Sequence, residues 1–236
     1  MTVIEINADD PEAAALWRSV GELAEQLPGE WLLIGGLMVQ LHALERGITQ
    51  VRATSDIDIL GQARPQWTLT ALHETLEKLG FELVGPDLDG YAHRYRNEDD
   101  LIVDVLSPEG ITPPPKLGGV KAVGAPGGTQ ALQRAETVTV TVQGTTFELR
   151  RPTLLGSILI KARSLMVHSD PPTQREDLLR LLSLLEDPRE VAKQLTRNER
   201  KWLLRARQRL DMDAPSGLDA EAGRRAVFAY ELLIVA

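Results

Sequence analysis

Two aspartates stand two residues apart in the run DIDIL at residues 56–60. Successive side chains of a strand alternate between its faces, so a strand here places Asp56 and Asp58 on one face and the isoleucines on the other. Two like charges at this spacing repel each other unless a cation lies between them, and carboxylate oxygens are preferred ligands of Mg²⁺. The pattern predicts a cation site, and the alternative is a solvated strand face with two free aspartates.

A third aspartate, Asp104, stands inside the β-branched run LIVDVL at residues 101–106. A carboxylate in a core strand costs free energy unless it is ion-paired or binds a metal. If this strand lies beside the first one, Asp56, Asp58 and Asp104 form a triad. Such a triad can hold two metal ions around the attacking and leaving oxygens of an in-line phosphoryl displacement.

The apolar run WLLI at residues 31–34 ends in Gly35 and Gly36 and leads into a helix-like pattern. This order predicts a strand, a tight turn and a helix. Glycines at such a turn let a ligand approach the backbone, and the N-terminus of the helix offers free N–H groups to phosphate oxygens. The two glycines therefore either bind a phosphate or only satisfy the geometry of the turn.

The periodicity of the remaining chain predicts a mixed α/β (α+β) fold. Helices are expected over residues 11–27 and 66–79, strands over 81–84, 91–96 and 101–106, a long loop over 107–128, and a β-hairpin over 137–142 and 145–149. Consecutive strands with short turns pair antiparallel, so the sheet should be mixed. A domain boundary is placed near Arg151-Pro152, because the pattern is helical from residue 153 onward.

Two stretches of the helical part carry positive charge. Lys161 stands in the middle of the apolar stripe of residues 154–167, where it can snorkel at the edge of the stripe. Residues 193–209 hold seven Lys and Arg against one Glu and read as one basic helix. That helix is either a solvated face or a surface for an RNA backbone.

The net charge of −8 is unevenly distributed along the chain. Residues 1–110 carry 20 acids and 7 Lys and Arg (net −13), whereas residues 111–236 carry 14 acids and 19 Lys and Arg (net +5). The basic half is the better candidate for holding phosphates. The absence of cysteine excludes disulfides and thiolate metal sites. No signal peptide or membrane-spanning run is recognisable, so a cytoplasmic protein without a membrane partner is expected.

The glycine pair, the two spaced aspartates and the third carboxylate together resemble the nucleotidyltransferase superfamily built on the DNA polymerase β core. The segments GGLMVQLH at 35–42 and RATSDID at 52–58 look most like the AbiEii-type abortive-infection toxins, which include the MenT-like enzymes. The resemblance implies a mixed-sheet nucleotidyltransferase domain over residues 1–151 and a C-terminal helical domain over residues 152–236.

The same resemblance assigns roles to individual residues. Asp56, Asp58 and Asp104 become the catalytic residues and the ligands of Mg²⁺ or Mn²⁺. The residues implied to bind the nucleotide are Gly35, Gly36, Arg52, Thr54, Lys161 and Asp177. From residue chemistry alone, Arg52 either binds a phosphate or fixes the start of the strand at Asp56. Asp177 is equally explained as an acid favoured in the first turn of a helix.

The implied reaction transfers a nucleoside monophosphate from an NTP to a hydroxyl of tRNA or protein, with release of pyrophosphate. The implied biological role is the toxin of a toxin–antitoxin or phage-defence system, opposed by a cognate antitoxin. Two alternatives stay open. One is a nucleotidyltransferase with a small-molecule, aminoglycoside-like acceptor, and the other is a non-catalytic interaction module on the same fold.

Overall fold

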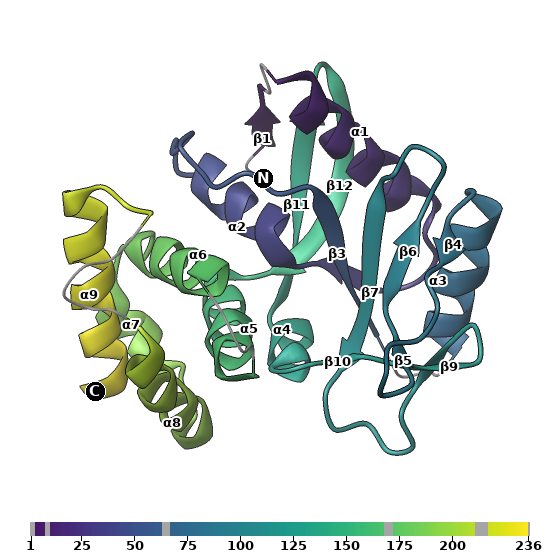
Figure 1. The fold of residues 1–236 in the computed structure, drawn as a ribbon. Coiled ribbons are helices and arrows are strands. Elements are labelled where there is room, and N and C mark those ends of the chain that lie inside the picture. Colours follow the sequence, from purple (N-terminus) through teal and green to yellow (C-terminus); the bar gives the residue numbers. More distant parts are fainter. Residues whose placement is uncertain (1–2, 8–9, 63–66, 168–171, 211–216, 236) are drawn as a thin grey trace.

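The computed structural model describes residues 3–7, 10–62, 67–167, 172–210 and 217–235. The β-sheets and the first helices form one side of the molecule, and the helices after residue 153 form the other (Figure 1). The fold is therefore mixed α/β, with helices added after the sheets, as the sequence predicts.

The largest sheet has six strands in the order β2-β3-β7-β6-β4, with β10 paired to β7. These strands are β2 (Trp31–Leu33), β3 (Asp56–Gly61), β7 (Ile102–Pro108), β6 (Arg94–Arg96), β4 (Glu82–Leu83) and β10 (Gly124–Ala125). β3 and β7 run parallel, whereas β2 pairs antiparallel with β3, and β6 pairs antiparallel with both β7 and β4. The prediction of a mixed sheet is confirmed.

A second sheet has the order β1-β11-β12, formed by β1 (Val3–Ile6), β11 (Ala135–Val142) and β12 (Thr145–Pro152). The predicted hairpin is confirmed. Gln143 and Gly144 join its strands with φ values of 48° and 87°. Positive φ at both central residues is what a two-residue hairpin turn that matches the strand twist requires.

The prediction of one long loop over residues 107–128 is wrong, because three short strands lie within it. β8 (Lys116–Leu117) and β9 (Val120–Ala122) form a third sheet with β5 (Tyr91–Ala92), and β10 joins the largest sheet. Gly118 and Gly119, with φ values of 54° and 85°, turn β8 into β9, and Leu117 is fully buried. A Gly-Gly pair between two short apolar segments is itself a hairpin signal.

In the part of the chain that the structure describes, four helices accompany the sheets. They are α1 (Pro11–Gln26), α2 (Gly35–Leu44), α3 (Trp67–Lys78) and α4 (Gly128–Gln133). Asp10 caps α1 by accepting from the backbone N–H groups of Glu12 and Ala13, and Pro11 suits the first turn. The helix predicted over 66–79 is α3, although residue 66 lies outside the described residues. α1 and α3 share one hydrophobic core with Ile57 and Ile59 of β3.

Within the described residues, five helices follow the sheets. They are α5 (Leu154–Val167), α6 (Pro172–Ser183), α7 (Pro188–Lys193), α8 (Arg197–Ala206) and α9 (Ala220–Val235), with a 3₁₀ turn over Arg207–Arg209. Their core also takes in Met38 and Val39 of α2 and Leu60 of β3, so these helices pack directly on the sheet-bearing part. The prediction of a single basic helix over 193–209 is wrong, because a capping box of Thr196 and Glu199 begins a new helix, α8.

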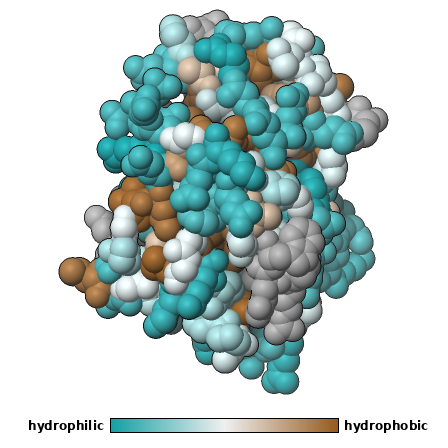
Figure 2. Space-filling model, turned by 90° about the vertical axis from the view of Figure 1, so that its right-hand side faces the viewer, coloured by the Kyte–Doolittle hydropathy of each residue, from teal (hydrophilic) through white to brown (hydrophobic). Residues whose placement is uncertain are grey.

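The surface is mainly polar where Figure 2 shows it. Hydrophobic patches on this face are small and separated by hydrophilic side chains (Figure 2). Within the described ranges, no helix combines the length and hydropathy needed to cross a bilayer.

Candidate active site

The pairing of β3 with β7 brings the three aspartates together. Asp58 stands directly opposite Asp104 in the parallel register, and Asp56 lies two residues earlier on the same face of β3. Ile57, between the two aspartates, is fully buried on the opposite face. Asp56, Asp58 and Asp104 each offer a carboxylate oxygen, and these three oxygens lie within 4.8 Å of one another. The predicted triad is confirmed as a geometric cluster.

Asp58 carries the least compensated charge of the triad. Asp58 as a whole residue is partly accessible to solvent, but its carboxylate lies against Gly35. Burial raises the pKa of Asp58 to about 7, and repulsion by Asp56 adds to this effect, while Lys161 opposes it. A divalent cation would offset both the free-energy cost of burying the charge of Asp58 and its repulsion by Asp56. The hard oxygen donors of the triad therefore fit Mg²⁺ or Mn²⁺.

The glycine turn at the start of α2 packs against these acids. Gly35 has a φ of +69°, and a Cβ atom there would lie 1.7 Å from Oδ2 of Asp58. A Cβ on Gly36 would lie 2.8 Å from Nη2 of Arg52 and 2.9 Å from Oγ1 of Thr54. Each glycine is thus required where the surrounding side chains leave no space. The turn also presents the N-terminus of α2 beside the triad.

Arg52, Lys161 and Asp177 form a second charged cluster. Arg52 donates from Nε and Nη2 to the two carboxylate oxygens of Asp177 at 3.1 and 3.0 Å. Lys161 donates from Nζ to Oδ2 of Asp177 at 2.8 Å and to Gln174 at 3.2 Å. Burial alone would raise the pKa of Asp177, but the charge of Lys161 and the contacts of Arg52 outweigh it and lower that pKa.

The burial of this cluster corrects two interpretations of the sequence. Lys161 and Asp177 are only 4% and 2% exposed, so Lys161 is not a snorkelling side chain. Asp177 lies beyond the first turn of α6, which begins at Pro172, so it is not an ordinary acid of the first turn. Its position is explained by the two cations that it pairs with.

The segment before β3 is held in place by both clusters. Thr54 donates from Oγ1 to Oδ1 of Asp56 at 2.9 Å. The backbone carbonyl of Arg52 accepts from Nε2 of Gln40 on α2 at 2.8 Å. These contacts, with the ion pair to Asp177, let Arg52 fix the start of β3, and its binding of a phosphate stays a prediction.

Arg94 also contacts the triad, and none of the sequence patterns above pointed to it. It lies opposite Asp104 in the antiparallel pairing of β6 with β7, and it donates from Nε and Nη2 to Oδ1 and Oδ2 of Asp104 at 2.9 and 2.7 Å. These hydrogen bonds raise the pKa of Arg94 above its ordinary value. Nε2 of His93 is 4.0 Å from Oδ2 of Asp104. The signal was available, because a hairpin that turns at residues 97–101 places residue 94 opposite residue 104.

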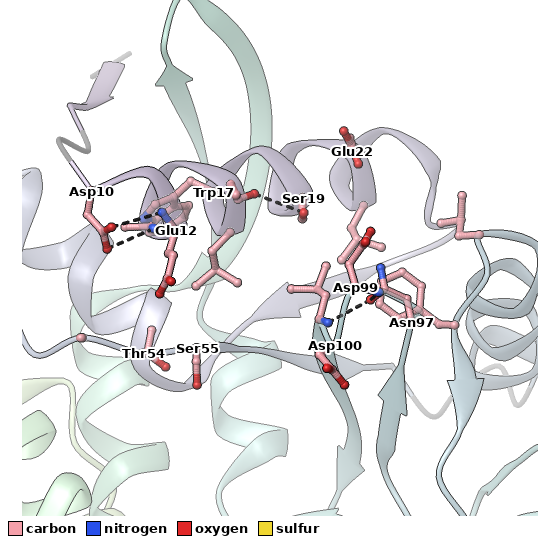
Figure 3. Close-up of a pocket in the computed structure, with 18 of the residues that line it drawn as sticks. Asp10, Glu12, Trp17, Ser19, Glu22, Thr54, Ser55, Asn97, Asp99 and Asp100 are labelled. Carbon is pink, nitrogen blue, oxygen red and sulfur yellow. Dashed lines mark hydrogen bonds between the residues drawn. The ribbon is translucent and has the colours of Figure 1, made fainter.

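A pocket of about 850 Å³ lies between α1, residues 53–55 and residues 97–101 (Figure 3). Its lining includes Thr54 and Ser55 but none of the three aspartates of the triad. The acids that line it are Asp10, Glu12, Glu22, Asp99 and Asp100. The pocket thus adjoins the segment that leads into β3 and is separate from the triad itself.

The chain resembles proteins of solved structure in its fold. No protein-family model matches the chain, and no curated protein matches its sequence. The crystal structure of an antigenic nucleotidyltransferase-like protein from Paracoccidioides brasiliensis does match in three dimensions, with a TM-score of 0.51 and 16% identity over 87% of this chain and 91% of that chain. The chain has a nucleotidyltransferase-like fold.

On this nucleotidyltransferase-like fold, the triad lies at the centre of the largest sheet with charged partners on two sides. Arg94 contacts Asp104 directly, and Lys161 acts on Asp58 through its charge. Among the described residues one guanidinium contacts the three carboxylates, which leaves an excess of negative charge. Such a donor set can bind divalent cations and can accept a proton.

Proposed function

We propose that this protein is a metal-dependent nucleotidyltransferase that moves a nucleoside monophosphate from an NTP to a hydroxyl acceptor. The observation that carries the proposal is the approach of the carboxylates of Asp56, Asp58 and Asp104 to within 4.8 Å on a nucleotidyltransferase-like fold. An exposed pair of aspartates would not need a third, buried carboxylate directly opposite one of them.

The chemistry follows from the roles of the three acids. Asp56, Asp58 and Asp104 would hold Mg²⁺ or Mn²⁺, and the bound ion would offset the charge that develops on the phosphoryl oxygens. The acceptor oxygen forms a bond to the α-phosphorus of the NTP, and the bond from that phosphorus to the oxygen shared with the β-phosphate breaks. Pyrophosphate leaves, and the hydroxyl proton passes to Asp104.

The nucleotide is held from the side of α2 and α5. The backbone N–H groups of Gly35 and Gly36 at the start of α2 face the triphosphate, where a helix N-terminus favours anions. Lys161 and Arg52 neutralise the triphosphate, and Asp177 keeps both cations in place. The charge of Lys161 already acts on Asp58, which supports its placement beside the triad.

The acceptor in this proposal is tRNA or a protein. Exposed cations recur every fourth residue along α8 at Arg197, Lys201 and Arg205, and none of the three has an ion pair within the described part of the chain. A row of free cations on one helix face supports an acceptor with a phosphate backbone. The resemblance to AbiEii-type enzymes further leads us to propose a toxin that acts against a cognate antitoxin, with residues 1–151 catalytic and residues 152–236 helical.

The proposal is tested by label transfer. The purified protein is incubated with Mg²⁺ and each α-labelled NTP, with total tRNA or with a cell lysate. The comparison proteins are Asp56→Ala/Asp58→Ala and, as a matched control, Glu98→Ala in an exposed turn. Label should pass to RNA or protein with the wild type and the Glu98 variant and not with the double variant.

The other outcomes separate the alternatives. Mg²⁺-dependent NTP binding without transfer to either macromolecule would favour a small-molecule acceptor. If calorimetry detected neither NTP binding nor transfer, the enzymatic function would be contradicted and a non-catalytic module favoured.

A further inference from the structure

Arg94 donates two hydrogen bonds to Asp104, the third carboxylate of the triad. Both oxygens of Asp104 accept from its guanidinium, at 2.9 and 2.7 Å. The side chain of Asp104 is only 8% exposed, whereas that of Arg94 is 39% exposed at the edge of the site. Nε2 of His93 lies further away, at 4.0 Å from Oδ2 of Asp104.

An ordinary surface ion pair would explain a contact of this kind elsewhere on the hairpin. Arg96, two residues further along β6, provides that case, because it meets Asp100 through one 3.2 Å contact with both side chains largely exposed. Such surface pairs contribute little to stability. Arg94 differs in two respects, since its contact has two parallel hydrogen bonds and its partner is a buried member of the triad.

The two-point contact has opposite effects on the two tasks of Asp104. A carboxylate has about four lone-pair positions, so a guanidinium that takes two of them fixes the carboxylate plane and leaves the others free. The positive charge of the same guanidinium repels any divalent cation that approaches the triad. Arg94 therefore orients the carboxylate while it weakens the attraction of the site for metal.

We propose that Arg94 is a positioning residue, which fixes the carboxylate of Asp104 toward the acceptor side and limits the affinity of the triad for its divalent cation. The inference rests on the proposed nucleotidyltransferase function for its effect on rate. Its effect on metal affinity follows from the triad alone. Within the described part of the chain, no other residue donates a hydrogen bond to Asp104.

Three variants separate charge from geometry. Arg94→Gln removes the charge and the two-point contact, Arg94→Lys keeps the charge and loses the two-point contact, and Arg96→Gln is the matched control on the same strand. Mg²⁺ affinity of the full chain is measured by calorimetry, nucleotide transfer by a single-turnover assay, and folding by metal-free melting curves.

The expected results have opposite signs for Arg94→Gln. Mg²⁺ should bind several-fold more tightly because a repelling charge is gone, while transfer should slow by roughly ten- to a hundredfold because the carboxylate is no longer oriented. Arg94→Lys should bind Mg²⁺ as the wild type does and still transfer slowly. Arg96→Gln should match the wild type in both measurements.

Several outcomes would overturn the proposal. They are weaker Mg²⁺ binding by Arg94→Gln, unchanged transfer by it, or a lysine variant that behaves like the glutamine variant in both assays. Failure of both the wild type and Arg94→Gln to bind Mg²⁺ would overturn it as well. A wild type that binds Mg²⁺ but transfers nothing would contradict the proposed function alone, and the Mg²⁺ titrations would then decide the role of Arg94. If Arg94→Gln melts early, Arg94→Lys decides.

Discussion

The two charged clusters of this molecule differ in how their charges are balanced. In the cluster of Arg52, Lys161 and Asp177, one buried carboxylate is matched by two cations at 2.8–3.1 Å. In the triad, three carboxylates converge within 4.8 Å, and Arg94 contacts only one of them. The first cluster supplies the counter-charge of its carboxylate from within the protein, whereas the second keeps an excess of negative charge that a cation from solution would offset.

This difference is visible in the pKa values of one acid from each cluster. The pKa of Asp177 is lowered because Lys161 and Arg52 outweigh the effect of its burial. The pKa of Asp58 is raised to about 7 because burial and Asp56 are not outweighed. Burial alone therefore does not decide in which direction the pKa of a buried carboxyl group shifts. The balance of neighbouring charge decides it.

The largest effect is expected for Asp58→Asn, which removes the carboxylate of the triad whose charge is not offset. Transfer should fall by roughly a thousandfold or more, because removing a metal ligand forfeits several kcal/mol of transition-state stabilisation. Without metal at pH 8, the same change should raise the free energy of unfolding, since a repelled carboxylate becomes neutral. Transfer assays and urea unfolding test the two effects. A variant that is both inactive and less stable would argue that Asp58 is a structural acid.

The corresponding change in the balanced cluster is Asp177→Asn. It leaves the buried Lys161 and the half-buried Arg52 without their counter-charge, so the free energy of unfolding should fall by about 3–5 kcal/mol at pH 7. Urea unfolding measures this change. The control is Glu190→Gln, which breaks the exposed ion pair with Lys193 and should leave stability unchanged. Equal stability of the Asp177 variant and the wild type would show that the cluster is not balanced by Asp177.

The smallest expected effect is the pH dependence of metal binding. Because Asp58 has a pKa of about 7 in the metal-free protein, a cation must displace a proton from it below that pH. Mg²⁺ should bind roughly tenfold more weakly at pH 6 than at pH 8, about 1.4 kcal/mol. Calorimetry at the two pH values checks this. Asp177 should not contribute to this pH dependence, because its lowered pKa keeps it ionised throughout the range. Equal Mg²⁺ affinities at the two pH values would contradict the triad as the metal site.

The triad could be predicted from the sequence because its signals are local. Alternation along residues 56–60 determines which side chains share a face, and an acid inside the apolar run 101–106 needs a partner. Only the adjacency of the two strands had to be assumed, and the parallel pairing of β3 with β7 supplies it. The glycine turn and the hairpin after β11 were predictable for the same reason.

The second cluster could not be predicted from local signals. The pairing of Asp177 with Lys161 and Arg52 depends on how α6 packs against α5 and on the path of the segment before β3. Helical periodicity gives the buried face of a helix but not the residue that it meets. Arg94 and the start of α8 are different cases, because the sequence itself carries their signals. The hairpin register places Arg94 opposite Asp104, and Thr196 with Glu199 forms a capping box.

The turn at Gly35 has a consequence for how the chain tolerates mutation. A residue with a side chain would need an unfavourable positive φ and would place its Cβ 1.7 Å from Oδ2 of Asp58. Every substitution at this position, alanine included, therefore displaces a carboxylate of the triad. Gly35 has no functional group of its own. In a saturation mutagenesis scan it would nevertheless tolerate substitution as poorly as the aspartates do.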